Sequence, residues 1–167
     1  MKDLKHLYEF EKLLQDANNE LVKKAKADGG LPLGYTCYHI PEVLLNCGNC
    51  FSVRLRAPRT GSMDIATYYM SNFLCGYSKA ILERAIEGGY NFLGALLASE
   101  TCSEMNRTAE HFELLDLVPE EKFFVTFLDM PFKLEAHTVK HYVNQTRVKI
   151  LDKLSEVYGV DTSDEAL

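Results

Sequence analysis

The sequence predicts an α/β fold, a Rossmann-like three-layer sandwich with a mainly parallel central sheet and helices on both faces. Short apolar, β-prone segments alternate along the chain with longer segments of helical periodicity. These helical segments are long enough to be the crossover connections that parallel strands require. The 167 residues suit a single domain. The expected strands are 35–38, 50–55, 93–98 and 122–128.

The ends of the expected helices are placed at residues that favour helix starts, such as Asp and Pro, or helix stops, such as Gly. An amphipathic helix is expected within 1–30, with its stop at Gly29-Gly30. A long helix that Asp64 can cap carries Cys75 and ends at Gly88-Gly89. The other expected helices are 41–46, 103–115 and 134–158.

The chain is expected to have one folded unit and the start of a connection. Residues 31–160 are predicted to form the Rossmann-like domain. Residues 161–167 have the pattern of an N-cap and first helical turn, with Thr162 or Ser163 as the cap. We therefore expect one domain of a longer protein, with a disordered tail as the alternative interpretation of the last residues.

Charge and hydropathy narrow the functional classes. The net charge of −6 is spread along the chain, whereas nucleic-acid binding requires a clustered basic face, so a metabolite or a protein is the expected partner. The N-terminus lacks the features of a signal peptide, and no apolar run approaches the roughly 20 residues needed to cross a bilayer. The sequence therefore predicts a cytoplasmic protein whose five cysteines are thiols or metal ligands.

Cys75 and Cys102 are the thiols expected to carry chemistry. Cys102 follows an expected strand and precedes a helix, so free backbone N–H groups and the positive helix end can stabilise its thiolate. Cys75 lies opposite the main apolar stripe of its helix, and Lys79, one turn on, favours the thiolate. Ligands of open α/β sheets bind beyond the strand carboxyl ends. The alternative for each cysteine is a purely structural, packed thiol.

The remaining cysteines are expected to pack in the interior. Cys47 and Cys50 form a C-x-x-C pair, but a strand rather than a helix follows the pair, so neither thiol gains a helix N-terminus. A zinc site would need further ligands, for which Cys37 and His39 are the nearest candidates.

His137 and His141 stand four residues apart on one helical face, the spacing of a two-histidine metal site. Thr138 occupies the place where a zinc protease would need its glutamate. We therefore expect this face to be solvated. The sequence contains no Gly-rich nucleotide fingerprint and no nucleophile elbow.

Three segments carry a family resemblance. They are HIPEVLLNCGNCFSVRLRAP from His39, YYMSNFLCGYSKAILERAIEGGYNFLGALLASETC to Cys102, and LDMPFK followed by the helix ending YGVDTSDEAL. In this order they resemble the D-component family of 2-hydroxyacyl-CoA dehydratase subunits, which also includes benzoyl-CoA reductase subunits. The resemblance covers about residues 34–167 and identifies this stretch with the N-terminal domain of such a subunit. Its most specific part is FLCGYSKAILE followed by TC.

The resemblance implies a 4Fe-4S cluster held by three cysteines, of which Cys75 and Cys102 match the first two. No cysteine follows Cys102, so the third ligand would lie in a second domain beyond Leu167. We expect the 167 residues alone to be inactive and to hold a cluster poorly, because iron sites of this kind normally need three or four thiolates.

The resemblance also implies a reaction and its partners. Two related subunits pair, and an ATP-hydrolysing iron–sulfur activator delivers one recycled electron. The electron turns the thioester carbonyl of an (R)-2-hydroxyacyl-CoA into a ketyl radical, which expels the hydroxyl and, after proton loss, yields an enoyl-CoA. Many relatives carry an acid two places after a proline, where this chain has Val43, so Glu42 is the one catalytic candidate. This departure favours the partner subunit, whose cluster relays the electron.

Two other interpretations remain. Within the same superfamily, the chain is a benzoyl-CoA-reductase-type or double-cluster reductase subunit that uses the same thiols. In a different class, it is a non-catalytic α/β interaction domain in which all the cysteines are structural. Neither the acyl group nor the identity of the partner is encoded in a recognisable motif.

Overall fold

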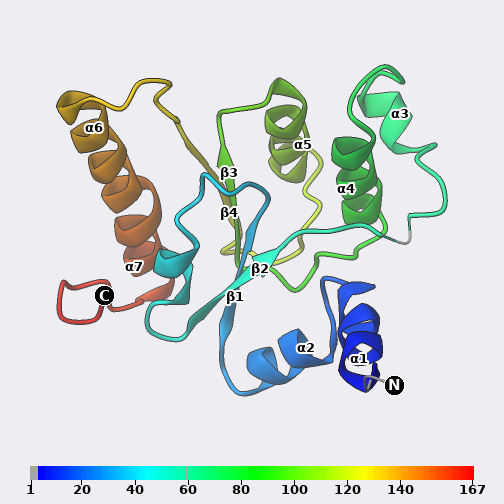
Figure 1. The fold of residues 1–167 in the computed structure, drawn as a ribbon, viewed down its shortest axis with the longest axis horizontal. Helices are drawn as coiled ribbons and strands as arrows, with labels where there is room; N and C mark the ends of the chain where they lie inside the picture. The colour runs from blue at the N-terminus through cyan, green and yellow to red at the C-terminus, as the bar shows by residue number, and fades with distance from the viewer. Residues whose placement is uncertain (1–3, 59) are drawn as a thin grey trace.

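The structure, a computed structural model, describes residues 4–58 and 60–167. Its sheet has four parallel strands in the order β2-β1-β3-β4 (Figure 1). Leu33 of β1 pairs with Ala95 of β3, and Ala95 pairs with Phe124 of β4. The predicted α/β class is therefore confirmed. The strands are β1 (Leu31–Tyr35), β2 (Cys50–Arg54), β3 (Ala95–Ser99) and β4 (Phe124–Leu128).

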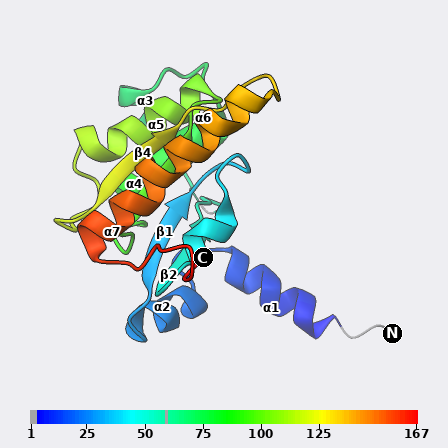
Figure 2. The same ribbon diagram turned by 90° about the vertical axis from the view of Figure 1, so that its left-hand side faces the viewer.

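The sheet is the middle of three layers, with a hydrophobic core and helices on each of its faces. Alternate side chains of a strand point to opposite faces, and every residue of β3 is buried. Leu96 and Ala98 pack in one core with α4 (Gly76–Ile86) and α5 (Ser103–Leu114). Ala95 and Leu97 pack in the other core with the C-terminal helical segment. In Figure 1 the C-terminal helices lie on one side of the strands and the α4–α5 pair on the other, and Figure 2, turned by 90°, shows the C-terminal helices in front.

The C-terminal helical segment confirms the helix predicted over 134–158. It consists of α6 (Ala136–Thr146), a π-helical stretch η2 (Arg147–Asp152) and α7 (Lys153–Tyr158). Gly159, with a φ of 68°, ends it in the left-handed conformation that glycine adopts without strain. Within residues 4–58 and 60–167, no helix is long and apolar enough to cross a membrane.

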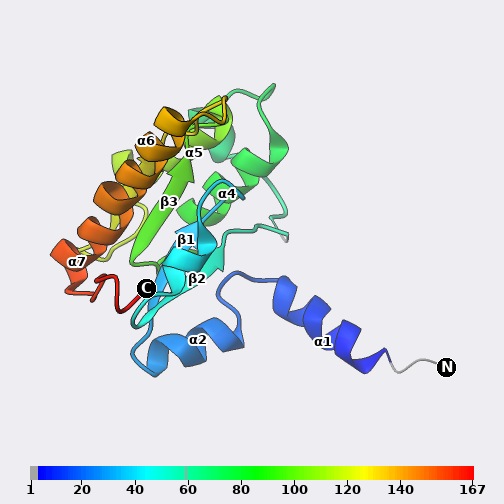
Figure 3. The same ribbon diagram turned by 60° about the vertical axis from the view of Figure 1, so that its left-hand side comes forward.

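The single helix predicted within 1–30 is wrong, because the chain forms two helices there. These are α1 (Lys5–Leu14) and α2 (Glu20–Ala27). The Asn19 side chain accepts hydrogen bonds from the backbone N–H groups of Leu21 and Val22, and this N-cap starts a new helix. α1 has no buried residue and projects from the sheet (Figure 3). Residues 1–3 of the prediction lie outside the described residues.

The long helix predicted to carry Cys75 is also wrong. A short helix, α3 (Ala66–Tyr69), ends at Met70, whose backbone is extended with φ −130° and ψ 131°. Burial of the Met70 side chain against Leu82 stabilises this break, and α4 starts only at Gly76. Cys75 is consequently the N-cap of α4 rather than a residue in the middle of a helix.

The N-terminal strand and the C-terminal turn differ from expectation. The sequence placed the first strand at 35–38, whereas β1 begins at Leu31 and contains Pro32 and Gly34, which normally argue against a central strand. The helix expected at 41–46 is the 3₁₀ helix η1 (Glu42–Asn46). Residues 161–167 form a turn rather than a helix. The Arg147 side chain, on the preceding helical segment, donates a hydrogen bond to the Thr162 carbonyl in this turn.

Removal of a core side chain should destabilise the protein far more than the same change on the surface. Leu33 is fully buried between the sheet and the C-terminal helices, whereas Leu114 is exposed. Leu33→Ala should lower the free energy of unfolding by about 2–5 kcal/mol, and Leu114→Ala should change it by less than about 0.5 kcal/mol. Urea unfolding followed by circular dichroism measures both values. Equal losses in the two variants would contradict the arrangement of layers.

Candidate functional site

The candidate site lies at the carboxyl edge of the sheet. All four strands end at this edge, and the N-termini of α4 and α5 reach it as well (Figure 1). After β1 the chain passes to η1 in one core, and after β3 it passes to α5 in the other. This divergence makes a topological switch point between β1 and β3, where open α/β sheets bind their ligands.

Cys102 lies at this switch point as the N-cap of α5. Its backbone is extended, with φ −145° and ψ 117°, and its thiol donates a hydrogen bond of 3.1 Å to Glu104 Oε2. That hydrogen bond holds the pKa of the exposed Glu104 carboxyl below its usual range. The position predicted for Cys102, between a strand and a helix, is confirmed. The first N–H groups of α5 therefore point toward the cysteine.

Cys75 occupies the equivalent position on α4 and is exposed. The backbone N–H of Ser78 lowers the pKa of the Cys75 thiol most, and the N–H of Tyr77 and the Ser78 hydroxyl add to this effect. The prediction that Lys79 favours the Cys75 thiolate is wrong. The Lys79 ammonium instead donates a hydrogen bond of 3.0 Å to the carbonyl of Asn72 and stabilises the turn before the helix.

The two cysteines share a neighbour, and this shows that the two helix ends converge. The charge of Glu104 acts on Cys75, where it partly offsets the lowering of the thiol pKa, while the same carboxylate accepts the hydrogen bond from Cys102. Beneath them, the Thr108 hydroxyl on α5 bonds to the carbonyl of Ser78 on α4 at 3.2 Å. The helices are thus joined one turn below their caps.

The donor set fits part of an iron–sulfur site. Thiolates are the ligands that iron–sulfur clusters prefer, and free N–H groups at helix N-termini favour negatively charged groups. Cys75 and Cys102 provide both features. Among the residues the structure describes, no group of three or more His, Cys, Asp or Glu side chains could hold a metal ion. The pair therefore fits two positions of a ligand set that needs at least one donor from elsewhere.

The other cysteines fall into two environments. Cys47 and Cys50 are buried, as predicted, and burial together with the adjacent Cys47 thiol raises the pKa of Cys50 to about 12. Cys37 is only partly buried and follows β1 at the carboxyl edge. Burial raises the pKa of Tyr77. Cys37 and Cys75 raise the same pKa further, so Tyr77 is a common neighbour of the two cysteines. Sequence reasoning missed this position of Cys37.

Glu42 and the histidine pair contact residues other than the cysteines. The Glu42 carboxylate accepts a hydrogen bond of 3.1 Å from Ser52 and interacts with the hydroxyl of Tyr35. His137 and His141 are exposed and lie 3.4 Å from the carboxylates of Glu135 and Asp129, respectively. The expected solvated face is confirmed.

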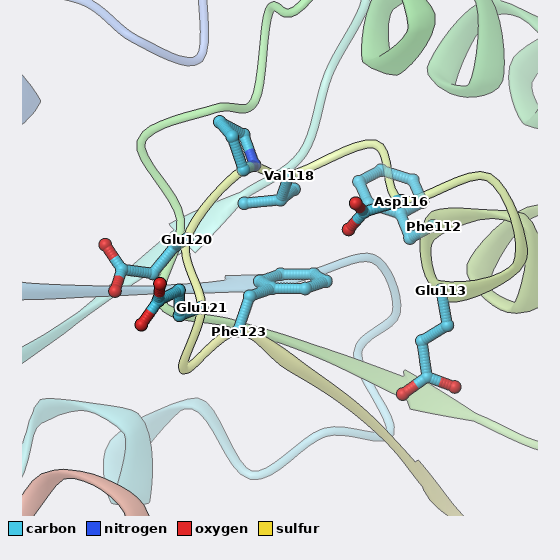
Figure 4. Close-up of a pocket in the computed structure, with 8 residues that line it drawn as sticks. Phe112, Glu113, Asp116, Val118, Glu120, Glu121 and Phe123 are labelled. Carbon is cyan, nitrogen blue, oxygen red and sulfur yellow. The ribbon is translucent and has the colours of Figure 1, made fainter.

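Figure 4 shows a pocket of about 330 Å³ at the opposite, amino edge of the sheet. Four carboxylates line it, but Glu120 and Glu121 point away from Asp116, and Glu113 points in a third direction. The acidic groups therefore do not converge on a common point, as a cation site would require.

The fold and site define a class, a Rossmann-like α/β protein with a cysteine at the N-terminus of each of two neighbouring helices, at the carboxyl edge of its sheet. Residues 37–167 match the model of the family described as 2-hydroxyglutaryl-CoA dehydratase, D-component, and the chain belongs to this family. The family resemblance predicted from the sequence is thereby confirmed.

A relative that the chain matches at low identity is also a dehydratase subunit. The chain is 22% identical over 163 residues to the (R)-phenyllactyl-CoA dehydratase beta subunit of Clostridium sporogenes. The alignment covers 98% of this chain and 42% of the relative. The chain therefore spans less than half the length of the dehydratase subunit that it matches.

The environments of the thiols predict an order of reactivity. Cys75 should react fastest with iodoacetamide at pH 7–8, because it is exposed and a pKa below the usual thiol value leaves more thiolate at that pH. Cys50 should react slowest, because it is buried and its pKa of about 12 leaves almost no thiolate. Peptide mapping by mass spectrometry after chelator treatment measures the rates, and Cys75→Ser should remove the fastest phase. Equal rates at the two cysteines would contradict the assignment.

Proposed function

We propose that this chain is the N-terminal α/β domain of an iron–sulfur 2-hydroxyacyl-CoA dehydratase subunit. The reaction is the radical dehydration of an (R)-2-hydroxyacyl-CoA to an enoyl-CoA, with the electron supplied by an ATP-dependent activator. The observation that carries the proposal is the pair Cys75 and Cys102 at adjoining helix N-termini, in a chain of this family. The five free cysteines agree with a reducing, cytoplasmic location.

Within this proposal, Cys75 and Cys102 are two of the three ligands of a 4Fe-4S cluster, and the third comes from outside these 167 residues. When bound, such a cluster supplies a one-electron redox centre with an iron position open to a ligand. The chain prepares the first ligand, because the N–H groups of α4 favour the thiolate of Cys75 over the thiol. The extended backbone of Cys102 presents the second ligand at the mouth of the switch point.

Exposed apolar residues around the edge support completion of the site by another protein surface. The side chains of Phe73, Phe132 and Leu134 are 100%, 99% and 91% exposed, respectively. Phe73 lies two residues before Cys75, and the other two line an apolar pocket of about 370 Å³ after β4. Large exposed apolar side chains that cluster, as Phe132 and Leu134 do, are typical of interaction surfaces. The proposed covering surfaces are a homologous dehydratase subunit and a second domain of the same subunit.

The position of Glu42 supports the role of the partner subunit. Val43, at the place where many relatives carry an acid, is exposed and cannot transfer a proton. The Glu42 carboxylate is held by Ser52 and Tyr35 rather than by groups at the thiol site. We therefore assign this chain to electron relay, and place proton transfer on the paired subunit.

Iron binding by the full-length protein tests the ligand assignment. After anaerobic reconstitution with iron and sulfide, Cys75→Ser and Cys102→Ser should each lose most of the bound iron, because loss of one thiolate leaves too few ligands. Cys37→Ser is the matched control, since this thiol lies at the same edge but is not a proposed ligand. Iron and sulfide analysis with electron paramagnetic resonance gives the readout. Unchanged iron content in the first two variants would reject the cluster assignment.

Activity of the assembled enzyme tests the subunit role. With activator, ATP and a panel of 2-hydroxyacyl-CoA thioesters, the two-subunit enzyme should form enoyl-CoA, and Cys75→Ser should reduce kcat by at least about 100-fold. Glu42→Gln should change kcat less than about threefold, because the Glu42 carboxylate bonds to Ser52 and Tyr35 rather than to a proposed cluster ligand. Full activity with this chain as the sole substrate-binding subunit would contradict the relay role.

A further inference from the structure

A second pocket, separate from the thiol site, lies beside the C-terminal half of α4. It has a volume of about 250 Å³, and its lining comes from the linker between α1 and α2, the loop after β2, and α4. Three of its lining residues are charged, namely Arg56, Arg84 and Asp16. In a protein of net charge −6, the two arginines together with Asp16 leave the described lining with one net positive charge.

The backbone of Arg56 is fixed, but part of its guanidinium lacks an acceptor. The hydroxyl of Tyr90, a fully buried core residue, donates a hydrogen bond of 2.9 Å to the Arg56 carbonyl. The Nε atom of Arg56 is buried and has no hydrogen-bond partner in the described part of the chain. Buried donors are nearly always paired, because an unpaired one keeps its full desolvation penalty. Among residues 4–58 and 60–167, no side chain or carbonyl supplies an acceptor to this donor.

Arg84 is held at the opposite wall. Its Nη2 lies 3.1 Å from Asp16 Oδ2, its Nη1 lies 3.4 Å from Glu87 Oε2, and its stem lies against Gly89, where a Cβ would collide with it. The Thr60 hydroxyl completes the polar lining, whereas Ala57 and Pro58 make a small apolar wall.

We propose that this pocket binds phosphate groups, and that its ligand is the nucleotide part of coenzyme A. Arginine binds phosphate through paired, charge-assisted hydrogen bonds, and a hydroxyl group supplements them. A volume of about 250 Å³ admits a phosphate group with part of its nucleotide. The assignment to coenzyme A rests on the proposed function, whereas phosphate binding by itself does not.

The place of the pocket along α4 suits one acyl-CoA molecule that reaches both sites. Arg84 follows Cys75 by nine positions, which at 1.5 Å per residue corresponds to about 13 Å along the helix. The pantetheine arm separates the thioester of an acyl-CoA from its phosphates, so the two ends can occupy different sites. Tyr77 connects the two sites, since it follows Cys75 by two positions and its hydroxyl donates a hydrogen bond of 2.9 Å to the carbonyl of Leu55, the residue before Arg56.

Asp16 gives the proposal a test of opposite sign. Its carboxylate neutralises Arg84 and occupies donors that a phosphate would need. A purely structural pair of Arg84 and Asp16 would predict that loss of this carboxylate affects only stability. If the pocket binds phosphate, the same loss removes a competitor and a repulsive charge, and affinity must rise. Asn keeps the oxygen that accepts the Asn18 N–H, so Asp16→Asn retains the local turn.

Calorimetric titration of the full chain with adenosine 3′,5′-bisphosphate and with inorganic phosphate tests the inference. Arg56→Gln should weaken binding of the bisphosphate at least about tenfold, or about 1.4 kcal/mol, and Asp16→Asn should strengthen it. Arg147→Gln is the control, because this arginine pairs with Asp164 near the C-terminus, and it should bind like the unaltered chain. Circular dichroism confirms that each variant is folded.

The outcomes separate this inference from the cluster assignment. Cys75→Ser should bind the bisphosphate normally, because the pocket does not include the thiols. Absence of binding to the unaltered chain, or unchanged affinity in both Arg56→Gln and Asp16→Asn, would overturn the phosphate site whatever the iron content. Equal affinity for inorganic phosphate and the bisphosphate would overturn the assignment to a nucleotide.

Discussion

The packing of α4 against α5 is the constraint on which the candidate site depends. Thr108, buried in this interface, donates to the carbonyl of Ser78 on the neighbouring helix and to the carbonyl of Glu104 on its own. Both carbonyls lie within one turn of a helix cap. The same interface therefore brings Cys75 and Cys102 together, although 27 positions separate them in the sequence. A change in the packing of α4 against α5 would change the separation of the two thiols even if both helices stayed intact.

The sequence predicted what depends on hydrophobic periodicity and missed what depends on tertiary contacts. The parallel class, strands near β2, β3 and β4, and the position of Cys102 all follow from runs of apolar residues with strong boundaries. The break at Met70 could not be predicted, because an extended residue there is favoured only once its side chain is buried against Leu82. In β1, Pro32 and Gly34 concealed a strand that its two neighbours stabilise through pairing.

Environment, rather than residue type, distinguishes the cysteines. Cys50 lies in the core, where burial raises its pKa, because a thiolate there would lose its hydration without gaining a compensating partner. Cys75 lies at an exposed helix start, where backbone N–H groups supply that compensation. The C-x-x-C spacing alone would favour Cys50, whereas the environments in the fold favour a thiolate at Cys75. The family match does not give this ranking, since residues 37–167 include both C-x-x-C cysteines as well as Cys75.

The charges along α4 connect the thiol site to the arginine pocket. A helix carries partial positive charge at its N-terminus and partial negative charge at its C-terminus, so an acidic thiol at the start and a basic residue in the last turn both stabilise it. Cys75 and Arg84 occupy these two places. The helix thus favours a thiolate at one end and carries a guanidinium near the other. In the arrangement that we propose, Arg84 helps to hold the phosphates of an acyl-CoA, while its thioester lies near Cys75. One short helix would then serve both sites, because the charges that stabilise its two ends are the charges that the two proposed sites use.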